Sequence, residues 1–539
     1  MGQMPYDSLF DGWFFWHRMF LVPTSIDRHG LSSDDWLWMI RPEPFLSHPS
    51  MPDNYTITTW SILEYEDPKV NRRAFLKIAA IGAIASGAAV AGYYGPELLD
   101  IANTSVQSLD NQLQFGDTSF VTDDQKIPHL LRRAGFGSSP SELAYFENLG
   151  VTGAIDHLLN YENIDDSGVA SEPNITMART KTPVAEETVN LVWWWVNRMI
   201  NTPRPLEERM TLFWHNHFAT AIYKVRSPYL MFNQNQLLRS KGMGNFRDLL
   251  MGITEDPAML IWLDGARSKK NSPNENYGRE VMEVFTMGVG NYTEDDVKAA
   301  ARAFTGYKIN KSGNAFFNPN QHDNGTKTFL GQTGNFGPED IVNILASHPA
   351  TAQSISRKLF TYFAYDNPSD DTVNRLANVY TATDGNIKAV VESILNSDEF
   401  WSTQAHLALV KSPVDYLTIA LRSLGATANP RAMVATLNNM GQLPFDPPNV
   451  FGWPDGAAWI NTSTMMDRYN FPLLIRSPDN ATIAFEDSLD TATRTLFPEG
   501  LPSDVLQVIQ QSTDSLTSTA EKVRNLIRLT MSTPYYNLN

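Results

Sequence analysis

From about residue 118 onward, the apolar residues of this chain recur with the spacing of an α-helix. In residues 293–306, Thr293 can cap a helix, acidic residues fill the first turn, and Val297, Ala300 and Phe304 share one stripe. Similar helical periods occur around residues 141–160, 187–200, 206–218, 338–366, 386–400, 405–424 and 516–531. The pattern predicts a mainly α fold, with one large helical domain.

Strand signals are few and short, near residues 308–309 and 315–317. Loops rich in Asn, Gly and Pro separate the helical segments, and the loops at 310–337 and 441–464 are long for a compact domain. Long loops are usually either functional or disordered. No repeat of fixed period is present, so a solenoid is not supported.

Charge and cysteine content exclude several classes of function. The chain has 42 basic and 59 acidic residues, a net charge of −17, so we expect no nucleic-acid partner. It has no cysteine, which rules out disulfides, zinc–thiolate sites and iron–sulfur clusters. No phosphate-binding loop, serine-nucleophile elbow or His-Glu-x-x-His motif occurs, and we expect neither a nucleotide nor haem.

Residues 71–77, Asn-Arg-Arg-Ala-Phe-Leu-Lys, precede an uncharged, Ala- and Gly-rich stretch at 78–94. This resembles a bacterial twin-arginine export signal. The expected partner is then the twin-arginine export machinery, and the location is the periplasm or cell surface, with membrane contact only through residues 78–94. If the segment is a signal, it is either cleaved or kept as a membrane anchor. The alternative to a signal is a buried Ala-rich helix.

About 70 residues precede this signal, and they contain five of the thirteen tryptophans without a sustained period. We expect them to be disordered or to lie upstream of the true start, which would be Met51. The predicted organisation is a leader at 1–70, the signal or anchor at 71–94, a linker at 95–117 and a helical domain at 118–539.

Five segments carry most of the unusual polar and aromatic residues. They are HLLRRAGFG at 129–137, ERMTLFWHNHF at 208–218, NENYGREVMEVFTMG at 274–288, His322-Asp323 with Lys327, and PPNVFGWP at 447–454 with Trp459. In this order they resemble the bacterial exported family known as domain of unknown function 1800, over roughly residues 125–535. The resemblance implies export, a largely helical fold and a co-encoded sulfatase-like exported protein as a partner. It supplies no established activity.

The third segment has a helical spacing that places Glu275, Arg279, Glu280 and Glu283 on one face. One arginine cannot neutralise three glutamates, so the face could bind a metal, a cation or a sugar. The alternative is a solvated helix face joined by salt bridges between residues four apart.

Histidines in the second and fourth segments are candidate metal ligands. His217 lies on the apolar stripe of its helix and His215 points away, so they could share a metal only if the helix ended near Trp214 or the stretch were extended. The alternatives are a core role for His217 and a surface or capping role for His215. His322 and Asp323 suit either a ligand site or an Asx-type turn.

Arg132 and Arg133, with His129, open another predicted helix and either bind an anion or anchor the carboxylates at 275–283. Trp453 and Trp459 lie in a Pro- and Gly-rich loop, where they either stack on sugar rings or pin the loop to the core.

Two functions follow. The first is an extracytoplasmic metal-dependent hydrolase or oxidase, with Zn, Mn or Fe held by His215, His217, His322, Asp323 and Glu275, and with Glu280, Glu283 and Arg279 as catalytic residues. The second is a non-catalytic surface protein that binds polysaccharide or a partner through Trp453, Trp459, Arg132 and Arg133.

Overall fold

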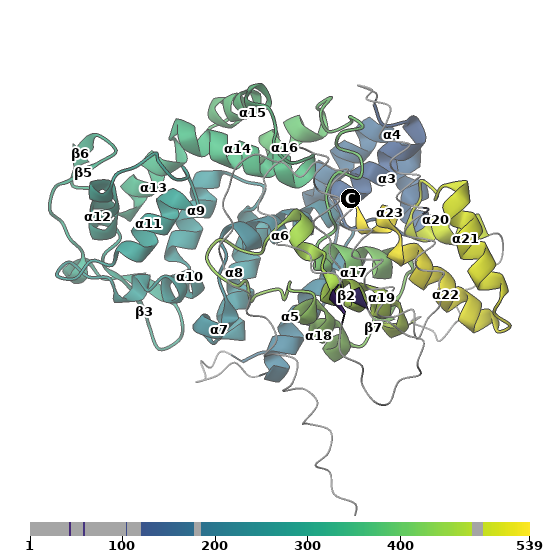
Figure 1. The fold of residues 1–539 in the computed structure, drawn as a ribbon. Coiled ribbons are helices and arrows are strands. Elements are labelled where there is room, and N and C mark those ends of the chain that lie inside the picture. Colours follow the sequence, from purple (N-terminus) through teal and green to yellow (C-terminus); the bar gives the residue numbers. More distant parts are fainter. Residues whose placement is uncertain (1–42, 45–57, 60–103, 105–119, 177–184, 477–488) are drawn as a thin grey trace, which may run out of the picture. The chain divides into compact units, whose positions relative to one another are not determined.

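A computed structural model describes residues 43–44, 58–59, 104, 120–176, 185–476 and 489–539 (Figure 1). The chain divides into two units, Met1–Glu66 and Asp67–Asn539. In the first unit, β1 (Glu43–Pro44) pairs antiparallel with β2 (Thr58–Thr59). The predicted export segment at 71–94, the proposed start at Met51 and, except for Thr104, the linker at 95–117 lie outside the described residues.

The second unit is mainly α-helical, which confirms the predicted fold class. Its described helices are α3 (Asp123–Arg133), α4 (Pro140–Leu159), α5 (Ala185–Asn201), α6 (Pro205–His217), α7 (Ile222–Val225), α8 (Pro228–Lys241), α9 (Phe246–Glu255), α10 (Pro257–Trp262), α11 (Glu275–Glu283), α12 (Glu294–Ala303), α13 (Pro338–Ala346), α14 (Pro349–Phe363), α15 (Asp370–Ala382), α16 (Ile387–Leu395), α17 (Pro413–Ser423), α18 (Pro430–Asn439), α19 (Thr462–Asn470), α20 (Leu489–Leu496), α21 (Ser503–Asp514), α22 (Thr519–Ser532) and α23 (Pro534–Asn537).

Local signals account for several of these helices. Thr293 caps α12 as predicted, since its side chain accepts a hydrogen bond from the Asp296 amide. The single helix predicted at 338–366 is wrong, because the chain forms α13 and α14 with a break at Ser347 and His348. Pro349 begins α14, and a proline disfavours helical backbone in the residue before it.

The strands of the second unit form three small antiparallel pairs. β3 (Tyr307–Ile309) pairs with β4 (Ala315–Phe317), as the sequence predicted. β5 (Lys327–Phe329) with β6 (Gln332–Gly334) lies in the loop predicted at 310–337, and β7 (Thr427–Ala428) pairs with β8 (Ile475–Arg476). None of these pairs covers the helices as a layer, so helix packing sets the position of the site.

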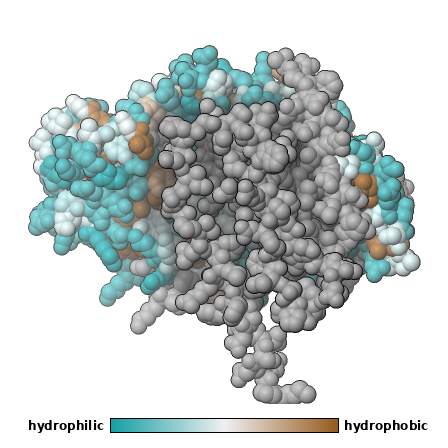
Figure 2. All heavy atoms as spheres, in the orientation of Figure 1, coloured by the Kyte–Doolittle hydropathy of each residue, from teal (hydrophilic) through white to brown (hydrophobic). Residues whose placement is uncertain are grey.

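Aromatic side chains fill much of the core of the second unit. Trp195 and Trp214 are fully buried, and their indole N–H groups donate to Glu208 and to the Gly242 carbonyl. Around the grey atoms of Figure 2, the described surface is mostly hydrophilic. Within the described ranges, no helix combines the length and the apolar character needed to cross a bilayer.

Candidate functional site

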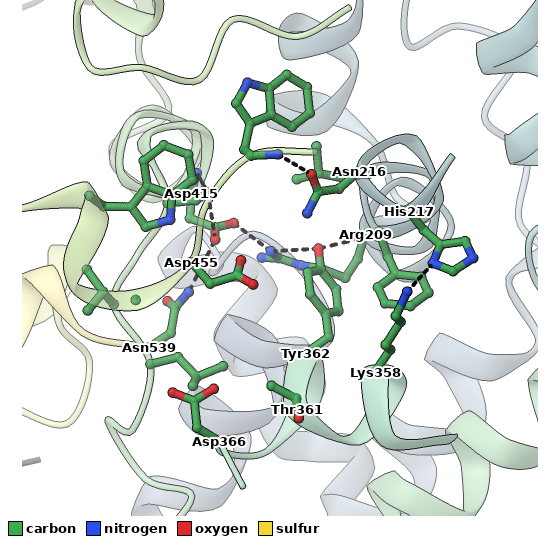
Figure 3. A pocket seen from close by; sticks show the side chains of 18 of the residues that line it. Arg209, Asn216, His217, Lys358, Thr361, Tyr362, Asp366, Asp415, Asp455 and Asn539 are labelled. Carbon is green, nitrogen blue, oxygen red and sulfur yellow. Dashed lines mark hydrogen bonds and ion pairs between the residues drawn. The ribbon is translucent and has the colours of Figure 1, made fainter. Parts of the chain in front are cut away.

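A cavity of about 400 Å³ lies where α3, α6 and α14 meet the loop at 441–461 (Figure 3). We call it the α6–α14 cavity. Five of the residues predicted for a site line it, namely Arg132, Arg133, His217, Trp453 and Trp459. The first, second and fifth sequence motifs therefore meet here. Glu275, Arg279, Glu280, Glu283, His215, His322 and Asp323 are not among its lining residues.

Two carboxylates that the sequence analysis did not select face this cavity. Asp366 follows α14 and Asp455 lies between Trp453 and Trp459 (Figure 3). Within the described part of the chain, neither carboxylate forms a hydrogen bond or an ion pair. Both side chains keep open surface toward the cavity, so they are accessible to a ligand.

The cavity walls perturb both acids. Loss of solvent around the carboxyl group, followed by repulsion from Asp366, raises the pKa of Asp455 from 3.8 to about 6. Burial also raises the pKa of Asp366, although the positive charge of Arg133 opposes this. Two carboxyl groups with raised pKa values in one cavity are suited to general acid–base chemistry.

A third acid of the cavity, Asp415, is already paired. Its Oδ1 accepts a hydrogen bond from Arg209 Nη1 at 2.6 Å, and the Ser412 hydroxyl donates to its Oδ2 at 3.1 Å. Arg209 is nearly fully buried, also donates to the Gly135 carbonyl, and lies over the Phe136 ring at 4.2 Å. This ion pair holds α6 to α17 and leaves little of Asp415 for a ligand.

The two arginines of α3 have structural partners. Arg132 Nη1 donates to Glu499 at 2.5 Å, and Arg133 donates to the carbonyls of Tyr362, Phe363 and Ala364 at the end of α14. The prediction that they anchor the carboxylates at 275–283 is wrong. They also close a helix and do not open one, because α3 begins at Asp123.

His217 and Lys358 form a pair on the wall made by α6 and α14. His217 Nε2 donates to the Phe285 carbonyl at 3.0 Å, which leaves Nδ1 to accept from Lys358 Nζ at 3.3 Å. Burial, and then the charge of Lys358, hold the pKa of His217 well below its usual range. Removal of solvent lowers the pKa of Lys358 to about 8.

The loop at 441–461 closes the cavity through a contact with α6. Gly452 has φ +85°, and a β-carbon there would overlap the side-chain oxygen of Asn216. This close approach lets the Trp453 amide donate to Asn216 Oδ1 at 2.7 Å. Trp453 and Trp459 are each only 4% exposed, so they pin the loop as the alternative interpretation held, whereas Phe451 is 66% exposed.

His215 lies beside this loop but is closed to ligands. It is buried, and its Nε2 accepts a hydrogen bond from the Phe445 amide at 2.9 Å. Burial lowers the pKa of its imidazole to about 3. The expected surface or capping role of His215 is therefore wrong. Since α6 continues to His217, the helix end that would let the two histidines share a metal is absent from this part of the structure.

The predicted acidic face of α11 is a salt-bridged surface. Arg279 donates through both terminal nitrogens to Glu294 at 2.8 Å, and its distance to Glu275 is 3.9 Å. Glu283 accepts from the Tyr292 hydroxyl at 2.5 Å. Glu280 is partly buried, and this burial, with the neighbouring Glu283, raises its pKa. The face matches the structural alternative named in the sequence analysis.

His322 and Asp323 form a turn beside α12. His322 Nδ1 donates to the Thr305 carbonyl at 2.9 Å, and Asp323 Oδ1 accepts from the Gly325 amide at 2.8 Å, which is the predicted Asx-type turn. Hydrogen bonds from Arg302 hold the pKa of Asp323 down at about 2. Among the described residues, no three His, Asp or Glu side chains are grouped so as to hold a metal ion. Metal binding stays a prediction.

The sequence analysis passed over Asp366, Asp455, Lys358 and Asn216. Asn216 lies inside the selected segment at 208–218, and Asp455 directly follows the one at 447–454. Asp366 and Lys358 belong to no selected segment. A search for acids in loops that end a helix could have found Asp366.

Comparison with known proteins identifies the family alone. The sequence matches the family described as Protein of unknown function (DUF1800). The match covers residues 129–538, which is more than half of the chain. Comparison with curated proteins gave no match, and comparison with solved structures gave none. The match runs from within α3 to α23 and includes every lining residue of the α6–α14 cavity except Asn539. The chain therefore belongs to the DUF1800 family.

Proposed function

We propose that this protein is a hydrolase that cleaves glycosidic bonds, with the α6–α14 cavity as its active site. The observation that carries the proposal is the presence of two carboxylates, Asp366 and Asp455, without partners in one cavity. A pair of Asp or Glu side chains at the scissile bond is the usual apparatus of glycoside hydrolysis.

The different surroundings of the two acids suggest their roles. Asp455, with a pKa of about 6, keeps its proton in mildly acidic solution and donates it to the glycosidic oxygen. Asp366 takes a proton from the attacking water as a new C–O bond forms at the sugar. The old C–O bond breaks, the leaving sugar departs as an alcohol, and solvent exchange returns both carboxyl groups to their starting state.

The rest of the cavity suits a sugar. Phe451 lies in the lining with an exposed ring, on which the apolar face of a pyranose could rest. Asn216, Thr361 and Gln442 add polar side chains to the same lining. A mixture of aromatic faces and amide or hydroxyl groups is what recognition of a neutral polyol requires.

Release of reducing ends from a panel of neutral and acidic polysaccharides tests the proposal. The wild-type protein should cleave at least one member, and Asp455→Asn and Asp366→Asn should each lose the activity while binding is kept. Asp371→Asn is the matched control, because Asp371 is exposed and lies outside the cavity lining. No cleavage of any member, or equal losses in all three variants, would refute the proposal.

A non-catalytic polysaccharide-binding protein is the second candidate, and the exposed ring of Phe451 favours it. Under that function, glycan binding by calorimetry would depend on Phe451, and no product would form even on long incubation. Binding that Phe451→Ala removes, together with no detectable cleavage, would decide for the binder.

Export and metal use are separate proposals. We propose delivery by the twin-arginine route, which peptide mapping of the protein from the periplasm and the cytoplasm would test. The proposed Zn, Mn or Fe would be tested by metal analysis of protein purified from that compartment. Metal near one atom per chain would support it, and a metal-free protein with full activity would refute it.

A further inference from the structure

We propose that the sugar bound in the α6–α14 cavity carries a carboxylate, as uronic acids do, and that Lys358 and Asn216 bind this group. The inference deepens the proposed function by naming the substrate class, and it rests on that function. It stands on the arrangement of donors on the wall formed by α6 and α14.

Lys358 is a cation whose partners are uncharged. Its Nζ donates to the Val284 carbonyl at 2.8 Å and to His217 Nδ1 at 3.3 Å, and it forms no ion pair with a carboxylate among the described residues. An ammonium group has three N–H donors, so one remains for a ligand. The side chain keeps open surface and lines the cavity, where a bound anion would balance its charge.

Asn216 presents a second donor to the same space. The Trp453 amide donates to Asn216 Oδ1 at 2.7 Å, so this bond fixes which end of the side-chain amide faces the loop. In Figure 3 the amide nitrogen of Asn216 points away from Trp453 toward the cavity. Its N–H groups have no partner among the described hydrogen bonds of the cavity.

Around Lys358 and Asn216 this wall offers N–H donors, and the hydroxyl of Thr361 on α14 can donate as well as accept. The lone pair of His217 Nδ1 is used by Lys358, and His217 Nε2 carries the proton that goes to Phe285. A ligand at this wall must therefore supply acceptors, and a carboxylate is the strongest acceptor that a sugar unit commonly carries. Asp366 and Asp455 would repel this carboxylate, so the charged group belongs beside Lys358 and the scissile bond beside the acids.

Binding is best measured in the Asp455→Asn background, so that cleavage does not consume the ligand. The probes are trigalacturonic acid and the neutral galactose trisaccharide of the same linkage, compared by calorimetry. We expect the acidic probe to bind at least about tenfold more tightly, the size of one charge-assisted hydrogen bond. Lys358→Met should remove this preference and leave the affinity for the neutral probe within about twofold.

Two further variants control for folding and charge. Lys358→Arg keeps the positive charge and should restore part of the preference. Lys388→Met removes a lysine of α16 that contacts Asn160 and Glu162 outside the cavity lining, and it should change nothing. Matching melting temperatures would show that every variant is folded.

Equal affinity for the two probes, or a preference that survives Lys358→Met, would overturn the inference. Covalent trapping of a sugar on Lys358 by borohydride would also overturn it, because the lysine would then act as a nucleophile. If Lys358 sets the preference but the wild-type protein cleaves neither probe, the subsite holds and the proposed hydrolase fails. If cleavage occurs without any role for Lys358, the hydrolase holds and the subsite fails.

Discussion

The acidic face of α11 and the acids of the α6–α14 cavity differ in what surrounds them. On α11, Glu283 has a hydroxyl partner and Arg279 is paired with Glu294, and the face lies on the surface. In the cavity, the charge of Asp366 repels that of Asp455, and neither carboxylate has a hydrogen-bond or ion-pair partner among the described residues. The density of charge along the sequence pointed to the first region, but unpaired charge in a concave site points to the second.

The difference teaches how to weigh a cluster of acids. Charges spaced four residues apart on a helix find each other or a neighbouring helix, and the resulting surface pairs contribute little free energy. Carboxylates without partners in a cavity raise the free energy of the unbound protein, and substrate binding or proton transfer can offset this increase. Each prediction below therefore compares a change at the cavity with a matched control change.

The largest effect should come from the acids themselves. Asp455→Asn removes the proposed general acid and should lower kcat/KM for glycan cleavage by roughly 10²–10⁴-fold. Glu283→Gln changes an acid of the α11 face and should leave kcat/KM within about twofold. Steady-state assays at pH 5.5 measure both. Similar losses in the two variants would mean that the cavity is not the active region.

The next largest difference should be in how much the ion pairs of the two regions contribute to the free energy of unfolding. Arg209→Met leaves Asp415 buried without its cation, and we expect a loss of about 3–5 kcal/mol in the free energy of unfolding. Arg279→Met breaks the more exposed pair with Glu294, and the loss should be below about 1 kcal/mol. Urea denaturation followed by circular dichroism gives both values. An Arg279 variant as unstable as the Arg209 variant would contradict this contrast.

Substitution of two glycines in the loop at 441–461 should give effects of intermediate size on stability. Gly452→Ala forces a β-carbon onto Asn216 at φ +85°, so it should cost at least about 2 kcal/mol and weaken glycan binding. Gly456→Ala, at φ +60° with no atom within 4 Å of the new β-carbon, should cost about 1 kcal/mol from backbone strain alone. Denaturant titration and calorimetry test the pair. Equal costs would mean that the loop does not depend on the contact with α6.

The smallest effect concerns pH and stability. The pKa of Asp455 is about 6 in the folded state and near 3.8 in the unfolded state. Between these two pH values, the folded chain therefore keeps a proton that the unfolded chain has lost. This contribution to stability is present below pH 3.8 and is lost as the pH rises through 6. The melting temperature of Asp455→Asn minus that of the wild type should therefore be larger at pH 7.5 than at pH 4.5. Thermal melts at both pH values, with Asp371→Asn as the control, would expose an opposite trend.

The sequence predicted what local rules determine. The cap at Thr293 and the short strands β3 and β4 follow from short-range spacing and hydrophobic pattern. It also selected Arg132, His217 and Trp453, which distant motifs bring to one cavity. These were chosen as unusual residues in long loops and helix ends, and such positions often line sites.

The remaining site residues depend on tertiary contacts that no local pattern records. Asp366 and Asp455 matter because neither forms an ion pair among the described residues. Arg279 matters less because it pairs with Glu294 on another helix and also lies near Glu275. For His215 the sequence left a metal site or a surface position open, because the residue lies away from one apolar stripe, but Phe445 and Trp453 cover that side too. Which charges stay unpaired is decided only when the helices pack.

The hydrogen bond between Trp453 and Asn216 joins residues 237 positions apart, and the Arg209–Asp415 pair spans 206. Closing loops of this length is entropically costly, and contacts at such separations form slowly compared with single helices. On dilution from denaturant, the helical dichroism should return early and affinity for a glycan late. A chain interrupted during synthesis before the 441–461 loop would carry most of its helices but a binding site that lacks Asp455 and the wall made by this loop.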